Sequence, residues 1–379
     1  MRKVINSFTY IDNDSDLHQA ADSWLGSECV ALDTEFMRVS TFYPEAALFQ
    51  IATEDQCFLI DPLAISDFKP LVELLENPEI VKVMHACSED LEVFNVALNC
   101  LPKAIYDTQI GAAFLGLGLS VGYKNLIDST FDVDLPKGEQ RSDWLQRPLT
   151  EKQLHYAMQD VVYLIEVYHR QQKALHEKGW LSWVEEELNV LLNKQRRNTD
   201  PSEAYLKVKG ASRLAPDKLR IIEVLAAWRE VEARERNIPR GFILKDPQLL
   251  DIAQRLPSSI QALSRTEGIR RKVVREDGEL ILELVEQGAS SQSIVVSFPE
   301  PLPPKAKTLI KDLQALLASI AEKAGLMPEL LLNRKTLVSL LTQLMNGGDA
   351  QLPSELPRWK EELFGEQLLS ALADMKGKL

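Results

Sequence analysis

The segment Glu28–Phe36 constrains the fold of this chain most, because its alternating pattern predicts a β-strand that carries two acids. Asp33 and Glu35 are two residues apart, so they project from the same face of that strand. Two carboxylates among apolar neighbours repel each other and lose hydration unless solvent or a cation compensates them. A hard divalent cation is one solution. For this motif taken alone, an exposed strand edge is the alternative.

A third acid, Asp90, follows a second apolar run at residues 80–86. The residues after this run predict the start of a helix, with Ser88 as its N-cap and Asp90 in its first turn. Stabilisation of the helix dipole explains an acid at this position without any metal. His85, at the end of the run, is expected to be packed or hydrogen bonded, because hard cations rarely recruit imidazole.

A fourth segment carries Tyr156 and Asp160 and has a complete helix start. Thr150 is the predicted N-cap, and Gln153 completes a capping box. Tyr156 and Asp160 are then four residues apart on one helix face, whereas His155 is displaced from Asp160 by about 140°. Tyr156 therefore shares the face of the acid. A half-buried tyrosine at the edge of the core is the alternative role.

These residues occur in the order of the three exonuclease motifs of the DEDD superfamily, tyrosine subtype, which the chain resembles. The motifs are Asp33-x-Glu35, Asp90 and Tyr156-x-x-x-Asp160. Further segments resemble the ribonuclease D family specifically: Tyr43-Pro44, Ile60-Asp-Pro62, Asp107-Thr-Gln109 and Ser142–Thr150. The resemblance spans nearly the whole chain.

The resemblance implies a ribonuclease H-like 3′-5′ exonuclease domain of the α/β class, with a mixed sheet flanked by helices. It also implies that Asp33, Glu35, Asp90 and Asp160 hold two divalent cations about 4 Å apart, Mg²⁺, Mn²⁺ or another metal. Asp33 is expected to bind both ions, Glu35 and Asp160 the ion on the nucleophile side, and Asp90 the ion on the leaving-group side. Tyr156 is expected to orient the attacking water, because a phenol is a poor base at neutral pH.

The sequence leaves three alternatives open. His155-x-Ala157-x-x-Asp160 also fits the third motif of the histidine subtype, which would make His155 the general base. Beside an exoribonuclease that trims precursor tRNA and other small structured RNAs, the motifs fit a 3′-5′ DNA exonuclease or an inactive RNA-binding scaffold. No phosphate-binding loop of the Gly-x-x-x-x-Gly-Lys-Ser/Thr type occurs, so no nucleotide cofactor is expected.

Composition favours a cytoplasmic enzyme without a membrane partner. The 379 residues are 45% apolar, which is enough to build the cores of two or three domains. No apolar stretch approaches the length of a membrane span, and the N-terminus lacks a signal-peptide core. The four cysteines have no metal-finger spacing, which favours free thiols. A monomer is favoured.

The net charge of −13 is unevenly distributed along the chain. Residues 1–210, the predicted exonuclease domain with its linker helix, hold 19 Lys and Arg against 33 Asp and Glu. Residues 211–297 carry a net charge of +1, and residues 298–379 carry none. Attraction of nucleic-acid phosphates is therefore expected to depend on local basic patches.

Two small all-α units are predicted after the exonuclease domain. In residues 211–297, Trp228-Arg and Pro239-Arg-Gly-Phe resemble the HRDC domain, a helical module whose usual role is nucleic-acid binding. The candidate RNA contacts are Arg234, Arg236, Arg240, Lys245, Arg270, Arg271 and Lys272. Residues 298–379 follow a proline-rich break and predict a divergent second HRDC-like unit. RNA binding and packing against the exonuclease domain are the two alternatives for this unit, which lacks clear counterparts of Trp228 and of the basic run.

Overall fold

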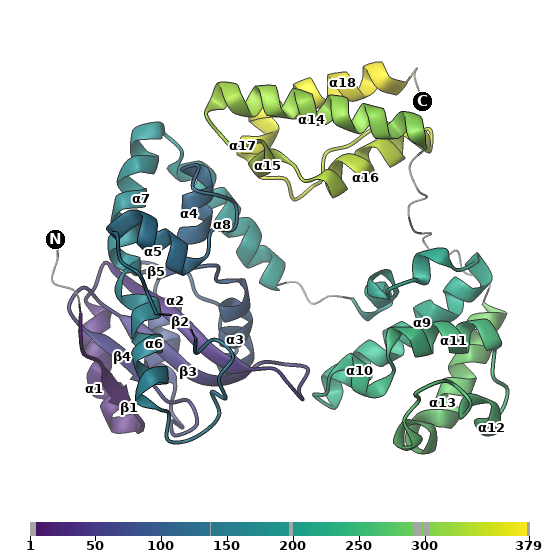
Figure 1. Cartoon of the computed structure of the whole chain (residues 1–379), viewed down its shortest axis with the longest axis horizontal. Coiled ribbons are helices and arrows are strands. Elements are labelled where there is room, and N and C mark those ends of the chain that lie inside the picture. The colour runs from purple at the N-terminus through teal and green to yellow at the C-terminus, as the bar shows by residue number, and fades with distance from the viewer. Residues whose placement is uncertain (1–4, 137, 197–199, 292–297, 299–302, 377–379) are drawn as a thin grey trace. The chain divides into compact units, whose positions relative to one another are not determined.

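The computed structural model describes residues 5–136, 138–196, 200–291, 298 and 303–376 (Figure 1). The chain divides into two compact units, each with a hydrophobic core of its own. The first unit contains Met1–Met37, Glu45–Arg196 and Leu302–Leu379, and the second contains Arg38–Pro44 and Arg197–Pro301. Among the described helices, none combines the length and the apolar character that crossing a bilayer requires.

A six-stranded mixed sheet lies in the first unit, in the order β1-β4-β3-β2-β5-β6. The strands are β1 Thr9–Ile11, β2 Cys29–Met37, β3 Glu45–Ala52, β4 Cys57–Ile60, β5 Val81–Met84 and β6 Ile105–Asp107. Strands β2, β3 and β4 form an antiparallel meander, and the other pairs are parallel. The predicted mixed sheet is confirmed, whereas the three-residue strand β1 was not predicted.

Strand β2 is buried along its first half and carries the two acids in its second half. Cys29–Leu32 are buried, which explains the apolar character of this part of the sequence. Strand β5 pairs with β2 only as far as Ala31, so Asp33 and Glu35 lie beyond the end of β5. The pairing register with β3 shifts directly after Glu35, as at a β-bulge. The acids therefore occupy the carboxyl edge of the sheet, where ligands of α/β proteins commonly bind.

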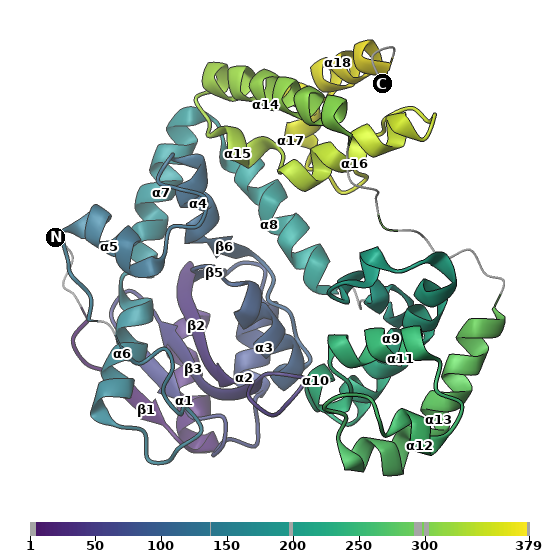
Figure 2. The same cartoon turned by 45° about the vertical axis from the view of Figure 1, so that its right-hand side comes forward.

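Eight helices accompany the sheet: α1 Asp14–Leu25, α2 Lys69–Glu76, α3 Ser88–Leu98, α4 Thr108–Phe114, α5 Tyr123–Phe131, α6 Glu151–Val162, α7 Leu164–Lys178 and α8 Leu181–Arg196. Helix α6 packs against β2, β3 and β4 (Figure 2). It begins with the predicted capping box between Thr150 and Gln153. Helix α3 packs against β2 and β3. The helices that carry the predicted site residues therefore both contact the strand that carries Asp33 and Glu35.

Arg147 fastens the segment before α6 to the sheet. Its guanidinium donates to Asp61 Oδ2 at 2.5 Å, to Asp61 Oδ1 at 2.6 Å and to the carbonyl of Ala47 at 2.7 Å. Asp61 also accepts a hydrogen bond from the Tyr10 hydroxyl at 2.8 Å. A bidentate arginine–carboxylate pair fixes geometry more strictly than a single hydrogen bond does. This arrangement sets where α6 starts relative to β3 and β4.

The C-terminal helices pack within the first unit. They are α14 Pro304–Ala324, α15 Pro328–Leu331, α16 Arg334–Met345, α17 Arg358–Lys360 and α18 Glu366–Lys376, with the π-helical turn Glu361–Gly365 before α18. Trp359 of α17 stacks on Trp183 of α8 with 4.9 Å between ring centroids. The Trp359 indole also donates to Glu187 Oε1 at 3.1 Å. This segment therefore packs against an exonuclease-domain helix, one of the two roles that its sequence left open.

The second unit is helical. It contains the 3₁₀ helices η1 Pro201–Lys207 and η2 Ala211–Arg213, and the helices α9 Pro216–Glu235, α10 Arg240–Ile243, α11 Asp246–Arg255, α12 Ile260–Leu263 and α13 Arg271–Ser290. The long helices α9 and α13 pack on each other, and η1 packs on α9. Gly288 permits the close approach of α13, since a Cβ there would lie 2.7 Å from Ile221 Cα.

One predicted helix cap is wrong. Helix α3 begins at Ser88 itself, and its N-cap is Cys87, which makes no capping hydrogen bond through its side chain. Ser88 instead accepts hydrogen bonds from the Gln195 amide, at 2.6 Å on its carbonyl and 3.2 Å on its hydroxyl. Asp90 still lies in the first turn, as expected. A contact with α8 therefore decides the role of Ser88, and no local pattern indicates that contact.

We expect Thr150→Ala to lower the free energy of unfolding by about 1 kcal/mol, because it removes the capping box of α6. Thr150 Oγ1 accepts the Gln153 N–H at 3.3 Å, and Gln153 Oε1 accepts the Thr150 N–H at 3.0 Å. Thr150→Ser keeps the hydroxyl and should change the stability by less than about 0.5 kcal/mol. Denaturant unfolding measures both variants. An alanine variant as stable as the serine variant would contradict the role of the cap.

Candidate active site

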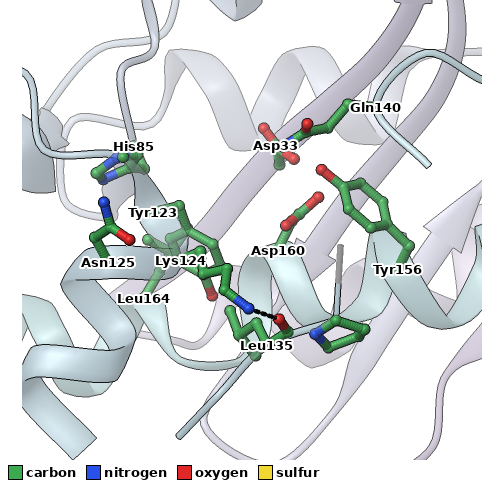
Figure 3. A pocket seen from close by; sticks show the side chains of 12 residues that line it. Asp33, His85, Tyr123, Lys124, Asn125, Leu135, Gln140, Tyr156, Asp160 and Leu164 are labelled. Atoms are coloured by element: carbon green, nitrogen blue, oxygen red, sulfur yellow. Dashed lines mark hydrogen bonds between the residues drawn. The ribbon is translucent and has the colours of Figure 1, made fainter. Parts of the chain in front are cut away.

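Three elements bring the four predicted acids to the carboxyl edge of the sheet. Strand β2 supplies Asp33 and Glu35, α3 supplies Asp90, and α6 supplies Asp160. One carboxylate oxygen from each of Asp33, Glu35 and Asp160 lies within 4.8 Å of the others. In Figure 3, the carboxylates of Asp33 and Asp160 face the same pocket. Residues from distant parts of the sequence therefore converge on one acidic site.

Asp90 lies deeper than the other three acids, with 7% of its surface exposed, and is not part of the group of three. Its Oδ1 accepts a hydrogen bond of 2.5 Å from the Thr34 hydroxyl. Thr34 lies between Asp33 and Glu35 in β2, so its side chain leaves the strand on the opposite face. This bond ties α3 to the strand that carries the acids.

Burial raises the pKa of every acid in the site. The pKa of Glu35 rises to about 9, that of Asp160 to about 7 and that of Asp90 to about 6. For Asp33, burial and then the charges of Asp90, Asp160 and Glu35 raise the pKa well above its usual range. Ionising all four carboxylates is therefore unfavourable without a compensating positive charge.

The donor set fits hard divalent cations. Carboxylate oxygens are the ligands that such ions prefer, and no histidine or cysteine belongs to the described group of three acids. Lys124 lines the same pocket, but its ammonium group donates to the Leu135 carbonyl and pairs with Asp134. The positive charge of Lys124 is therefore already balanced by Asp134. A bound cation would offset the repulsion that the raised pKa values reveal.

Tyr156 faces the acids, and His155 does not. Tyr156 lines the pocket with Asp33 and Asp160, and its hydroxyl points toward the Asp160 carboxylate (Figure 3). Burial, followed by the charges of Asp160 and Glu35, raises the pKa of Tyr156, so the phenol keeps its proton. His155 is exposed, and its Nε2 accepts a hydrogen bond from the Gln159 amide at 3.1 Å.

Asp33 and Asp160 line a pocket of about 440 Å³, and several of its other walls were not identified from the sequence. Tyr123, Asn125 and Gln140 belong to these walls. Tyr123 donates to the Gln159 carbonyl at 2.7 Å, and Gln140 lines the pocket together with Tyr156. No recognisable motif marks these residues.

His85 forms part of the same pocket and is hydrogen bonded, as its position predicted. Its Nδ1 lies 2.9 Å from Thr108 Oγ1, and its Nε2 lies 3.0 Å from the carbonyl of Val121. Burial lowers the pKa of His85. The neighbouring Asp107 accepts the N–H of Ala86 at 3.0 Å, which holds the end of β5 to the end of β6. His85 thus supports the pocket wall.

Three of the predicted RNA contacts are engaged in ion pairs within the second unit. Glu230, which is 3% exposed, accepts hydrogen bonds of 2.8 Å from both Arg234 and Arg240. Arg236 pairs with Asp277 at 2.5 Å. Because buried carboxylates need such partners, these arginines contribute to the core of the unit.

The other four predicted contacts lie on the surface. Arg270 places its guanidinium 4.3 Å from the centre of the Phe242 ring. Lys245, Arg271 and Lys272 are exposed, and Lys272 lies 3.9 Å from Glu276. The seven candidates therefore differ in how free they are to bind phosphate. Three are held in ion pairs with acids of the unit, and four lie on the surface.

Comparisons with known proteins agree with this architecture. A family model described as 3′-5′ exonuclease matches residues 8–176, and one described as HRDC domain matches residues 218–285. Ribonuclease D of Pseudomonas paraeruginosa is 43% identical over 365 residues, which are 96% of this chain and 97% of that protein. Ribonuclease D of Escherichia coli is 32% identical over 378 residues, which cover 97% and 99% of the two chains.

The solved structures include one of Escherichia coli RNase D, described as an exoribonuclease involved in structured RNA processing. It matches this chain with a TM-score of 0.87 and 31% identity, over 97% of this chain and 99% of the other. The α/β exonuclease fold followed by HRDC helices, expected from the resemblance, is thereby confirmed. The chain belongs to the ribonuclease D family of 3′-5′ exoribonucleases.

Proposed function

We propose that this chain removes nucleotides singly from the 3′ ends of structured RNAs, precursor tRNA foremost, and releases 5′-mononucleotides in the cytoplasm. The observation that carries this proposal is the convergence of Asp33, Glu35 and Asp160, because two of these acids, Asp33 and Asp160, line one pocket with Tyr156. The similar Escherichia coli enzyme, whose description names structured RNA processing, supports the class of substrate. The HRDC match adds a module that suits nucleic acid.

We assign Asp33, Glu35, Asp90 and Asp160 as ligands of two divalent cations, Mg²⁺ or Mn²⁺. Bound cations of this kind lower the pKa of an attacking water and neutralise charge on the phosphate and the leaving oxygen. Asp33 is assigned as the ligand shared by both ions, because the negative charges of the three other acids all raise its pKa. Asp90, which lies outside the group of three and is held by Thr34, is assigned to the leaving-group side.

Tyr156 is assigned to orient the attacking water. Burial raises the pKa of its phenol, which makes it a hydrogen-bonding group and not a base. In the reaction, the water oxygen forms a new bond to phosphorus while the bond from phosphorus to the 3′ oxygen of the preceding nucleotide breaks. The leaving oxygen takes up a proton and becomes the new 3′ hydroxyl of the RNA. Placing the water correctly before the reaction removes a large part of the activation free energy.

The choice of substrate can be tested directly. Release of 5′-mononucleotides is measured from a 3′-extended precursor tRNA and from single-stranded DNA of equal length, with Mg²⁺ or Mn²⁺. We expect faster release from the RNA. Faster release from DNA would favour the DNA exonuclease alternative, and binding without release from either polymer would favour the scaffold.

Asp33→Asn should reduce nucleotide release by more than about 100-fold, because it removes the assigned shared ligand. Titration calorimetry with Mn²⁺ should show weaker metal binding by the same variant. Asp55→Asn is the matched control, since Asp55 is exposed and does not belong to the acidic group. Normal release by the Asp33 variant would show that the metal site has been wrongly assigned.

Tyr156→Phe should lower kcat by about 100-fold while leaving the affinity for metal nearly unchanged. The phenylalanine keeps the packing of the ring but loses the hydroxyl that orients water. His155→Ala is the comparison, and it should retain most of the activity because His155 is exposed on another side of α6. A larger loss in the histidine variant would support the histidine-subtype mechanism instead.

The metal-free protein should lose stability as the pH rises from about 5 to about 9. The folded-state pKa values of Asp90, Asp160 and Glu35 are about 6, 7 and 9. The corresponding values in the unfolded chain are about 4, so the folded state binds more protons in this window and stability falls with rising pH. Mg²⁺ should therefore raise Tm more near pH 8.5 than near pH 5.5. Equal increases of Tm at both pH values would contradict this linkage.

A further inference from the structure

The second unit contains a pocket of about 490 Å³ that is rich in positive charge. Its walls come from the end of η1 and the residues that follow, from α9, and from α10 and the start of α11. The cations that line it are Lys207, Lys209, Arg229, Arg240 and Lys245, and the acids are Glu230 and Asp246. The pocket is built entirely from residues of this unit.

Both acids of this pocket are already neutralised by neighbouring groups. Glu230 is paired with Arg234 and Arg240. Asp246 accepts hydrogen bonds from Arg229 at 2.8 Å and from the backbone N–H of Lys209 at 3.0 Å. Neither carboxylate is therefore left to balance the charge of the lysine side chains.

Three lysines supply the uncompensated charge. Lys207, Lys209 and Lys245 are exposed, and within the described ranges no acid forms an ion pair with any of their ammonium groups. They come from two separate segments, one on each side of α9 in the sequence. The fold thus gathers three free positive charges around one cavity.

Arg229, whose charge is balanced by Asp246, adds a buried hydrogen-bond donor to the same wall. Only 5% of its surface is exposed, and it donates to the Leu244 carbonyl at 2.9 Å as well as to Asp246. Its Nε has no hydrogen-bond partner among the described residues. A buried N–H donor without a partner favours an acceptor such as a phosphate oxygen.

We propose that this pocket binds backbone phosphates of the RNA substrate. The inference rests on the proposed function, because an RNA strand is the polyanion on which the chain acts. Lysine ammonium groups bind phosphate as point charges and do not select bases. The pocket would therefore hold the strand independently of its sequence. Since the net charge of the chain is −13, a local site of this kind has to supply the attraction.

The proposed pocket gives a different set of RNA-contacting residues from the set named from the sequence. Of the candidates named from the sequence, it includes Lys245 and Arg240. Arg240 also pairs with Glu230 and lies 4.7 Å from the centre of the Phe42 ring, which limits its freedom. Lys207 and Lys209 were not candidates, because their segment was predicted to be a linker. Their role becomes visible only when η1 packs on α9.

The test uses the full chain with Asp33→Asn, so that RNA is bound but not degraded. Lys207→Gln, Lys209→Gln and Lys245→Gln are combined, and binding of a fluorescent 3′-extended precursor tRNA is followed by anisotropy at several salt concentrations. We expect the affinity to fall at least about tenfold near 0.1 M salt. The slope of log K against log salt should flatten by about 0.9 for each lost phosphate contact.

Two matched sets of variants control for folding and for net charge. Changing the same three lysines to arginine keeps the charge and should preserve the affinity. Lys311→Gln, Lys323→Gln and Lys335→Gln remove equal charge from exposed positions on α14 and α16 and should leave the affinity unchanged. The proposal is overturned if this control set weakens binding as much as the pocket set, or if the pocket set binds with unchanged affinity and salt slope.

Inorganic phosphate and 5′-AMP distinguish a site for a strand from a site for a small phosphate compound. We expect both to compete weakly with RNA, since each offers a single phosphate group. If the pocket variant loses binding of these small anions but keeps its affinity for RNA, the assignment to an RNA strand is wrong. Failure of the proposed function would appear separately, as absence of nucleotide release by the unsubstituted chain.

Discussion

Repulsion among Asp33, Glu35 and Asp160 is the constraint on which the rest of the first unit depends. Their oxygens lie within 4.8 Å of one another, and burial raises the pKa of each. Like charges in a recess of low dielectric repel more strongly than in water. Such a group would separate if its supporting elements could move. Two of the acids lie on β2 and the third on α6, so the position of α6 on the sheet decides whether the site forms.

Residues outside the acidic group fix that position. Arg147 bonds to Asp61 and to the Ala47 carbonyl, which joins the segment before α6 to β3 and β4. The capping box at Thr150 then starts the helix at a defined residue. Thr34, between the two acids of β2, holds Asp90 of α3 by a hydrogen bond. The site is therefore held by neighbours that need not touch the substrate themselves, which leaves the carboxylates free to bind cations.

The sequence indicated the acids because each lies in a local pattern. Alternation in β2 placed Asp33 and Glu35 on one face, and the helix start at Thr150 placed Tyr156 with Asp160. Their partners could not be predicted in the same way, because contacts between distant segments create them. The hydrogen bond from Thr34 to Asp90 spans 56 residues, and Gln140 lies in a loop without any periodic pattern. Strand β1 has three residues, too few for a pattern to emerge.

The second unit shows the same limit for charge. Its arginines are visible in the sequence, but the sequence does not show that Glu230 and Asp277 are buried. These two buried acids pair with several of the arginines and neutralise their charge. The planar guanidinium of arginine pairs well with a buried carboxylate, whereas the ammonium of lysine is strongly hydrated and stays in contact with water. Core packing therefore places several arginines in ion pairs with buried acids and leaves the lysines of the pocket exposed to water. Around the pocket of this unit, the charge that remains available to a polyanion belongs to Lys207, Lys209 and Lys245. A nearly neutral unit can still attract RNA, because binding responds to the local field and not to the net charge.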